Sequence, residues 1–243
     1  MTMKHLGEQS NPKLDSYSPN FLDSIPRNQK SLDKYFGVDF WNAYEFSYLN
    51  IKNIPVIETI EIKISMHSSY TVESKSLKIY LSSFYNKKFK NPLNAYKLIE
   101  KDLTKLLNSP VSVRRKTKYE NSPKSILLNN MNSKVSKNKI IQFQGFRSIC
   151  PVTLQPDWGN IYIHSSSNSI ESKKLIKLLK SYRNKGSFHE ACIESIFLTM
   201  LADFEIKDLT VYGKFLRRGG IDINPLRSTS KKLFFKNFRD FNQ

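Results

Sequence analysis

The chain has 243 residues, with 39 Lys and Arg against 21 Asp and Glu, which gives a net charge of +18. With 39% hydrophobic and 12% aromatic residues it is too apolar for a disordered chain, and two cysteines exclude a disulfide framework. No apolar run reaches the roughly 20 residues of a membrane helix, and the N-terminus lacks the apolar stretch of a secretion signal. We therefore expect a globular cytoplasmic protein that binds no membrane.

The first third of the chain predicts an extended arm followed by an α+β block. Residues 1–34 are polar and interrupted by proline, which favours an arm without regular structure. Residues 56–66 alternate between apolar and polar side chains, as a half-buried strand does. The period then changes to that of a helix over 77–84, and a second helix is predicted to start at Asn91-Pro92, a favourable cap pair. A short strand is predicted at 111–113.

A second block repeats this order after a stretch rich in Lys, Asn and Ser over residues 114–140, which reads as a linker. Its predicted elements are a strand around 161–163, helices through 175–182 and 193–204, a strand over 209–215, and a hairpin turn at Gly219-Gly220 into 221–223. Both blocks thus run strand, two helices, strand, which predicts an α+β fold of two tandem units. The predicted domains are the arm (1–34), a first unit (35–113), the linker (114–140) and a second unit (141–243).

Cys150 is the first candidate for chemistry. It precedes Pro151, which restricts its backbone, and Asp157 follows seven residues later past a second proline. A thiol with a nearby acid suits a nucleophile paired with a proton donor, if the thiolate is favoured locally. The alternative is a small buried residue and a turn aspartate. For Cys192, inside the predicted helix, packing is the interpretation that the spacing favours.

Two helix starts are candidates for binding. His189 and Glu190 begin the helix that leads to residue 204, where they either read the edge of a heterocycle or only complement the helix dipole. Val72-Glu-Ser-Lys-Ser76 lies at a strand-to-helix transition, and it is either an anion site or an ordinary capped helix start. The similar Glu171-Ser-Lys-Lys174 is read as an ordinary start.

A fourth candidate is the run Arg217-Arg-Gly-Gly220, either a phosphate clamp or a charged hairpin tip. No glycine-rich dinucleotide or phosphate loop is present in the sequence. The four histidines form no ligand cluster with the cysteines, so we expect no metal.

Taken together, four motifs resemble the NADPH-dependent 7-cyano-7-deazaguanine reductases of queuosine biosynthesis. They are SxCPVTxQPDWG (148–159), FHExCxExIF (188–197), VESKSLKxYLxSF (72–84) and RRGGIDINPxRS (217–228). Leu6-Gly7-Glu8 and the stretch WNAYEFSYLN (41–50) are similar to the long form of that family.

The resemblance implies two tandem T-fold units, with antiparallel sheets and paired helices on one face, that oligomerise. It also implies that Cys150 attacks the nitrile carbon to form a covalent thioimide, that Asp157 protonates the nitrogen, and that NADPH is the cofactor. The substrate-binding residues would be Val72, Glu73, Ser74, His189 and Glu190. The cofactor-binding residues would be Ser74, Lys75, Arg218 and Gly219. Relative to long-form members, residues 114–140 look shortened, which implies an incompletely formed first unit.

Two other functions compete with this interpretation. A T-fold pterin or purine enzyme of cyclohydrolase type would need a set of metal ligands. A basic RNA-binding protein would use the +18 charge, but the lysines are scattered along the chain and no known RNA-binding motif is present. We therefore expect a small deazapurine as substrate, no direct contact with nucleic acid, and a homo-oligomer, most simply a homodimer.

Overall fold

The computed structural model describes residues 16–27 and 32–243, which form two compact units. The N-terminal unit holds 41–118, the described residues up to 27, and the turn 218–221. The C-terminal unit holds residues 32–40, 119–217 and 222–243. The predicted domains are contiguous, whereas each unit takes in distant segments of the chain. The motif at residues 6–8 lies outside the described residues.

The sheet of the N-terminal unit has the order β6, β3, β2. Its strands are β2 (Phe36–Asn50, of which residues 41–50 belong to this unit), β3 (Pro55–Ser65) and β6 (Val111–Arg115), and β3 and β6 are antiparallel. Three short strands are added: β1 (Ser24–Pro26) pairs antiparallel with β4 (Tyr70–Val72), and β5 (Lys88–Phe89) runs parallel to the end of β2. A single 3-10 turn, η1 (Pro19–Phe21), precedes β1. The predicted strand at 56–66 is confirmed as β3.

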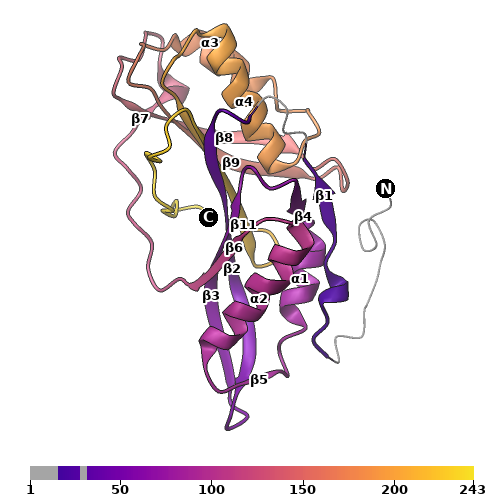
Figure 1. The fold of residues 1–243 in the computed structure, drawn as a ribbon. Helices are drawn as coiled ribbons and strands as arrows, with labels where there is room; N and C mark the ends of the chain where they lie inside the picture. Colours follow the sequence, from indigo (N-terminus) through magenta and orange to yellow (C-terminus); the bar gives the residue numbers. More distant parts are fainter. Residues whose placement is uncertain (1–15, 28–31) are drawn as a thin grey trace. The chain divides into compact units, whose positions relative to one another are not determined.

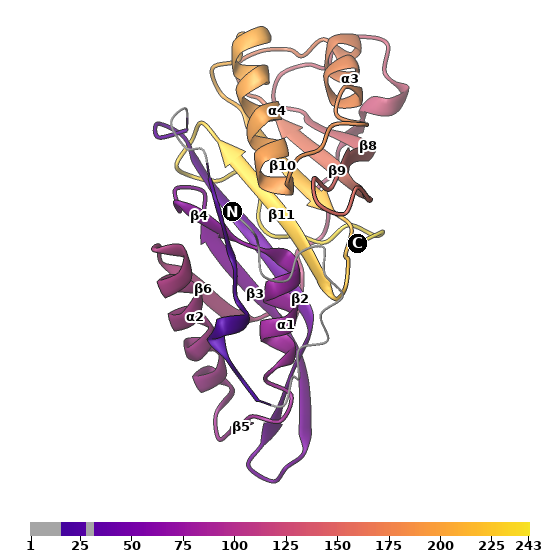
Figure 2. The same ribbon diagram turned by 90° about the vertical axis from the view of Figure 1, so that its right-hand side faces the viewer.

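Two helices, α1 (Ser74–Ser82) and α2 (Pro92–Leu107), lie side by side on this sheet (Figures 1 and 2). The side chain of Asn91 accepts from the backbone N–H of Leu93 and caps α2, as the sequence predicts. The core between helices and sheet contains fully buried aliphatic side chains, among them Ile60, Ile62, Ile64, Leu77, Ile99 and Leu103.

The sheet of the C-terminal unit has the order β11, β10, β9, β8, β7. Its strands are β7 (Ile126–Leu127), β8 (Ile140–Ile149), β9 (Pro156–His164), β10 (Thr210–Phe215) and β11 (Ile221–Ser228, from residue 222 on in this unit). The strands from β8 to β11 are antiparallel, and β7 is parallel to β8.

Helices α3 (Ser172–Lys180) and α4 (His189–Asp203) cover one face of this sheet (Figure 2). The chain after β11 contributes Phe235 and Phe238 to a second hydrophobic cluster of this unit. The other members of the cluster are Phe40, Tyr162, Tyr212 and Leu226. Both units therefore consist of a largely antiparallel sheet with a pair of helices, and the predicted α+β fold of two tandem units is confirmed.

Residues 114–140 differ from the expected linker. Within this stretch lie the end of β6, strand β7 and the 3-10 turn η2 (Leu128–Asn130). Leu128 is fully buried, and Val135 exchanges backbone hydrogen bonds with Ile170. Few apolar residues thus suffice to attach this polar stretch to the C-terminal unit.

Candidate functional site

Cys150 lies in the tight connection between β8 and β9. Its N–H donates to the carbonyl of Gln155 (2.9 Å), and its carbonyl accepts from the N–H of Leu154 (3.1 Å). Leu154 has a left-handed backbone (φ 55°), which closes the loop. The cysteine is partly exposed and not disulfide-bonded. The loop thus holds the thiol at a defined position with access to solvent.

The start of α4 is joined to the same strand end by the backbone. Ile149 donates to the carbonyl of Lys185 (3.1 Å) and accepts from the N–H of Ser187 (3.0 Å), and α4 begins two residues later at His189. The Glu190 side chain is buried, with 5% of the residue exposed. This bridge brings two motifs together that lie about 40 residues apart in the sequence.

Asp157 lies near both Cys150 and the start of α4. It pairs with Ser148 in the β8–β9 ladder, and Ser148 precedes Cys150 by two residues. Only 2% of Asp157 is exposed. Its Oδ1 lies 3.8 Å from Nε2 of His189, whose ring packs edge-on against Phe215. The structure therefore brings Cys150, Asp157, His189 and Glu190 to one end of the C-terminal unit.

Cys192 has a different environment. It is fully buried on α4, and burial raises the pKa of its thiol to about 12, although the Lys185 ammonium and the Ser148 hydroxyl lower it. Such a thiol stays protonated at neutral pH and is a poor nucleophile. This supports the packing interpretation.

The motif 72–76 forms the start of α1 in the N-terminal unit. Both carboxylate oxygens of Glu73 accept backbone N–H groups of the first helical turn, from Lys75 (2.9 Å) and Ser76 (2.6 Å). Ser76 is fully buried and accepts from the N–H of Asp23 (3.0 Å). The N–H groups that an anion would use are thus bound by Glu73. The substrate-binding roles of Val72, Glu73 and Ser74 stay a prediction.

The diglycine turn is part of the same unit. Arg218 and Ile221 exchange backbone hydrogen bonds, and Gly219 and Gly220 between them have φ of 56° and 76°, which confirms the predicted hairpin turn. A Cβ on Gly219 would lie 3.2 Å from the Lys78 side chain, one turn along α1 from Ser74 and Lys75. The turn and the helix start, which are distant in sequence, are therefore neighbours. Lys78 is a cation that the sequence interpretation missed, although it lies within the matched motif.

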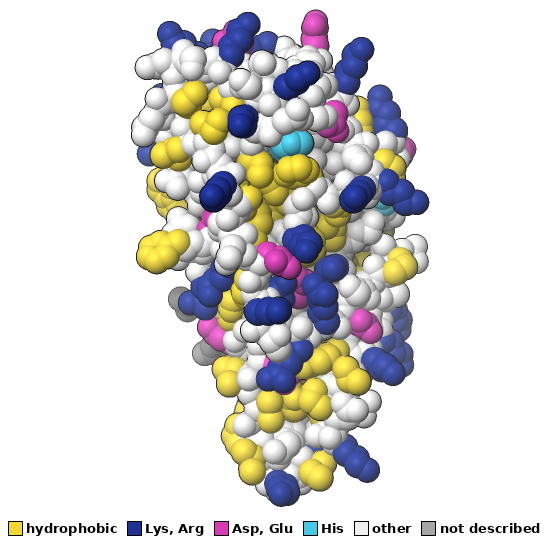
Figure 3. All heavy atoms as spheres, turned by 90° about the vertical axis from the view of Figure 1, so that its left-hand side faces the viewer, with side chains coloured by type: hydrophobic (Ala, Val, Ile, Leu, Met, Phe, Trp, Pro, Cys, Tyr) yellow, Lys and Arg dark blue, Asp and Glu magenta, His cyan; other side chains and the backbone are white. Residues whose placement is uncertain are grey.

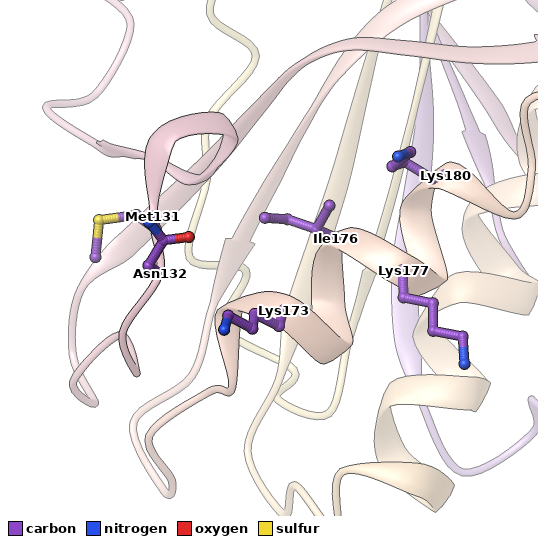
Figure 4. A pocket seen from close by; sticks show the side chains of 6 residues that line it. All are labelled: Met131, Asn132, Lys173, Ile176, Lys177 and Lys180. Carbon is purple, nitrogen blue, oxygen red and sulfur yellow. The ribbon is translucent and has the colours of Figure 1, made fainter.

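An open pocket on the surface of α3 is lined by lysines (Figure 4). Its lining residues are Met131, Asn132, Lys173, Ile176, Lys177 and Lys180. None of these six is an acid, a thiol or an imidazole, so we do not place the chemistry there. On the face shown in Figure 3, Lys and Arg are dispersed among neutral and hydrophobic side chains.

No helix within residues 16–27 and 32–243 is both long and apolar enough to span a membrane. Within the same ranges, no three His, Cys, Asp or Glu side chains gather as they would around a metal ion.

Two family profiles match this chain, and both describe nitrile reductases or proteins like them. Residues 14–115 match "Nitrile reductase, 7-cyano-7-deazaguanine-reductase N-term", and residues 156–234 match "QueF-like protein". Fold and matches together define the class, a two-unit T-fold protein of the nitrile reductase type.

Comparison with curated proteins gives the particular family. A protein of Coxiella burnetii (strain Dugway 5J108-111) is 37% identical over 93% of this chain and 92% of its own length. Relatives from Legionella pneumophila (strain Lens) and Buchnera aphidicola (subsp. Schizaphis graminum) are 36% and 37% identical, over 94% and 80% of this chain and 90% and 83% of theirs. All three are named NADPH-dependent 7-cyano-7-deazaguanine reductase. The chain belongs to this family.

Proposed function

We propose that this protein reduces the nitrile of 7-cyano-7-deazaguanine to the aminomethyl group with NADPH, a step of queuosine biosynthesis. The observation that carries the proposal is the thiol of Cys150, held in a hairpin loop beside a buried carboxylate and the start of α4. Relatives that match 93% and 94% of this chain bear the name of that reaction.

The nucleophile in this proposal is the Cys150 thiolate. Its sulfur forms a bond to the nitrile carbon, one π bond of the C≡N group breaks, and the nitrogen takes up a proton from Asp157. The product of this step is a covalent thioimide. Asp157 suits the role of acid because it is buried and pairs with Ser148, which precedes Cys150 by two residues, and because the imidazole of His189 lies within 4 Å of it.

Recognition of the heterocycle falls to the start of α4. The Glu190 carboxylate is buried at this helix start, and a carboxylate accepts the paired N–H donors of a guanine-like ring edge, which discriminates against a ligand without those donors. The imidazole of His189 offers a further polar edge beside it.

The residues of the N-terminal unit fit an anionic cofactor. The turn at Gly219 lets the backbone approach a ligand closely. Arg218 precedes this glycine in the chain, and the Lys78 side chain lies beside it, one helical turn from Lys75. NADPH, when bound, supplies hydride, and complete reduction of a nitrile to an amine consumes two. We assign Ser74, Lys75, Arg218 and Gly219 to this cofactor, and Lys78 with them.

The test mixes purified protein, NADPH and 7-cyano-7-deazaguanine and follows the loss of reduced nicotinamide absorbance. We expect two NADPH consumed per nitrile and, without NADPH, an intact-protein mass increased by one substrate. Folded protein that gives neither adduct nor oxidation overturns the proposal.

We also propose that the enzyme works in the cytoplasm as a homodimer and without direct contact to nucleic acid. On the face shown in Figure 3, Lys and Arg lie among neutral and hydrophobic side chains, which supports the last point. Sedimentation velocity of the purified protein tests the dimer, and a monomer at micromolar concentration contradicts it.

A further inference from the structure

The C-terminal unit contains a buried ion network that the proposed chemistry does not use. Arg227 on β11 is fully buried, and its Nη1 donates to Oδ1 of Asp39 (2.7 Å). Its Nη2 and Nε donate to Oε1 of Glu194 (2.6 and 3.1 Å), so one guanidinium joins the start of β2 to the helix α4. Burial lowers the pKa of Arg227, but the carboxylates of Asp39 and Glu194 outweigh it and raise the pKa.

Glu194 lies one helical turn from Glu190. Residues four apart share a face of a helix, so the carboxylate held by Arg227 and the carboxylate proposed to read the substrate project from the same side of α4. A rotation of α4 that released Glu194 would turn Glu190 by the same angle.

The start of α4 has no side-chain cap of its own. Its N-cap residue, Phe188, makes no capping hydrogen bond, whereas Glu73 caps α1 and Asn91 caps α2. The orientation of the first turn of α4 therefore depends on contacts of its side chains. Among them are the approach of His189 to Asp157 (3.8 Å) and, one turn beyond Glu190, the bond of Glu194 to Arg227.

The corresponding helix of the N-terminal unit lacks this contact. Counted from the first helical residues, Pro92 and His189, Glu194 corresponds to Lys97, which is exposed. A buried ion pair adds little stability over an apolar replacement, so stability alone is a weak reason to bury a network of three charges beside one helix and not beside the other.

We propose that Arg227 is a positioning residue, which through Glu194 fixes the rotation of α4 and with it the direction of the Glu190 carboxylate. The inference rests on the proposed function in that it assumes Glu190 binds the deazapurine.

The test measures noncovalent affinity for 7-cyano-7-deazaguanine by calorimetry in full-length Cys150→Ala protein, where no adduct forms. We expect Glu194→Gln to weaken binding about tenfold, and Glu190→Ala to weaken it at least as much. The double variant, Glu190→Ala with Glu194→Gln, should bind no more weakly than Glu190→Ala alone, because the Arg227–Glu194 pair affects binding only through Glu190. Glu171→Gln, an exposed acid at the start of α3, is the matched control and should bind like the parent.

A structural role without positioning gives a different result. Unchanged binding in Glu194→Gln, or losses that multiply in the double variant, overturn the inference. Hydrogen exchange gives an independent readout: Glu194→Gln should speed exchange in the first two turns of α4 and not in α3, and equal protection of α4 contradicts the inference. If the parent binds no nitrile, the proposed function fails. The exchange result still shows whether the Arg227–Glu194 pair fixes the start of α4. Glu194→Asp, which keeps the charge but shortens its reach, replaces the amide if that variant does not fold.

Discussion

The two units place different side chains at the same points of the same architecture. In the N-terminal unit the end of β2 pairs in parallel with β5, and α2 starts at Pro92, three residues after Phe89 ends β5. In the C-terminal unit Ile149 at the end of β8 pairs in parallel with Gly186, and α4 starts three residues later at His189. The backbone frame of the site is therefore present twice.

The chemistry is present once. Where Cys150 follows β8, Ile51 follows β2, and it is 63% exposed. Where Glu190 is the second residue of α4, Leu93 is the second residue of α2, and it is 56% exposed. The proposed site therefore does not follow from the fold alone, because the proposal depends on which residues occupy the strand end and the helix start.

The buried acids differ as well. Asp157 and Glu58 both lie seven residues before the end of their strands, β9 and β3. Glu58 accepts from the hydroxyl of Tyr96 and lies 3.3 Å from Nε of Arg115, whereas Oδ1 of Asp157 lies 3.8 Å from Nε2 of His189. One buried acid is thus beside a guanidinium, and the other is beside an imidazole.

The largest effect is expected from exchanging the thiol between the units. Cys150→Ala should lower nitrile-dependent NADPH oxidation by more than about a thousandfold, because the nucleophile is lost, without lowering the melting temperature. Adding Ile51→Cys to that variant should restore a reactive thiol but neither adduct nor turnover, since Glu58, the acid at the corresponding strand position, is paired with Arg115 and no carboxylate lies at the start of α2. Mass spectrometry with iodoacetamide and with the nitrile separates the two outcomes.

Cys192 provides the control for this exchange. Native protein should be alkylated once, at Cys150, and Cys150→Ala should resist alkylation until it is unfolded, because the remaining thiol is buried and protonated. A nitrile adduct in the Ile51→Cys, Cys150→Ala protein would break the comparison, since the N-terminal frame would then suffice for the first chemical step.

The next effect concerns stability and contrasts two glycines of one hairpin. Counted from the strand ends, Gly159 on β9 corresponds to the buried Ile60 on β3. A Cβ on Gly159 would lie 2.7 Å from the backbone carbonyl oxygen of Lys214, which cannot move aside without shifting β10. Gly159→Ala should therefore cost about 3 kcal/mol or more in unfolding free energy.

Gly145, in the bulge of β8, is the matched control. A Cβ there meets nothing within 4 Å, and only its φ of 70° opposes a side chain. Gly145→Ala should cost about 1–2 kcal/mol. Urea unfolding followed by circular dichroism measures both, and equal midpoints would contradict the steric argument.

Much of the fold was predictable, and the strands that were missed have a physical reason. Helix periods and the Asn91 cap identified the paired helices, and simple alternation identified β3 and β9. In β8 the buried side chains are Ile141 and Phe143 and then Phe146 and Ser148, because a bulge at Gly145 moves the pattern by one residue. The alternation that indicates a strand is interrupted there.

Strand β2 escaped prediction for another reason. From Phe40 to Ala43 its side chains are buried on both faces, so no alternation marks the strand. At the candidate site, the residue types could be predicted from the sequence, but their proximity in space could not. The bridge between Ile149 and Gly186 is a contact of backbone groups that carries no side-chain signature.

A smaller effect is expected at two helix starts with nearly the same sequence. Glu73-Ser-Lys-Ser76 and Glu171-Ser-Lys-Lys174 both provide a glutamate N-cap, but only Glu73 accepts backbone N–H groups and is buried. Glu73→Ala should cost about 1–2 kcal/mol, and Glu171→Ala less than about 0.5 kcal/mol, because the latter loses only a surface pair with Lys134. Thermal unfolding of both variants at the same pH measures the difference, and equal losses would show that burial of the cap does not matter.

The smallest expected effect is a dependence of stability on pH that arises in the C-terminal unit and not in the N-terminal one. His164 ends β9, where Ser65 ends β3, and its ring stacks on Phe234. Burial lowers the pKa of His164 below its ordinary value near 6.5, against the opposing charge of Asp208. The unfolded chain therefore binds the proton more readily than the folded one, so this contribution to stability is complete above about pH 6.5 and is lost as the pH falls below that value.

Titration of the nearby Asp208 does not overlap with that of His164. A hydrogen bond from Ser166 lowers the pKa of its carboxyl below 3.8, so its own contribution is lost only in stronger acid. Between pH 7.5 and 5.5 the melting temperature of the wild type should fall more than that of His164→Gln, while His67→Gln, a change at an exposed histidine of the N-terminal unit, should follow the wild type. A parallel fall in wild type and His164→Gln would place the titrating group elsewhere. If the folded C-terminal unit favours the neutral form of this half-buried imidazole, its removal must reduce the dependence of the melting temperature on pH.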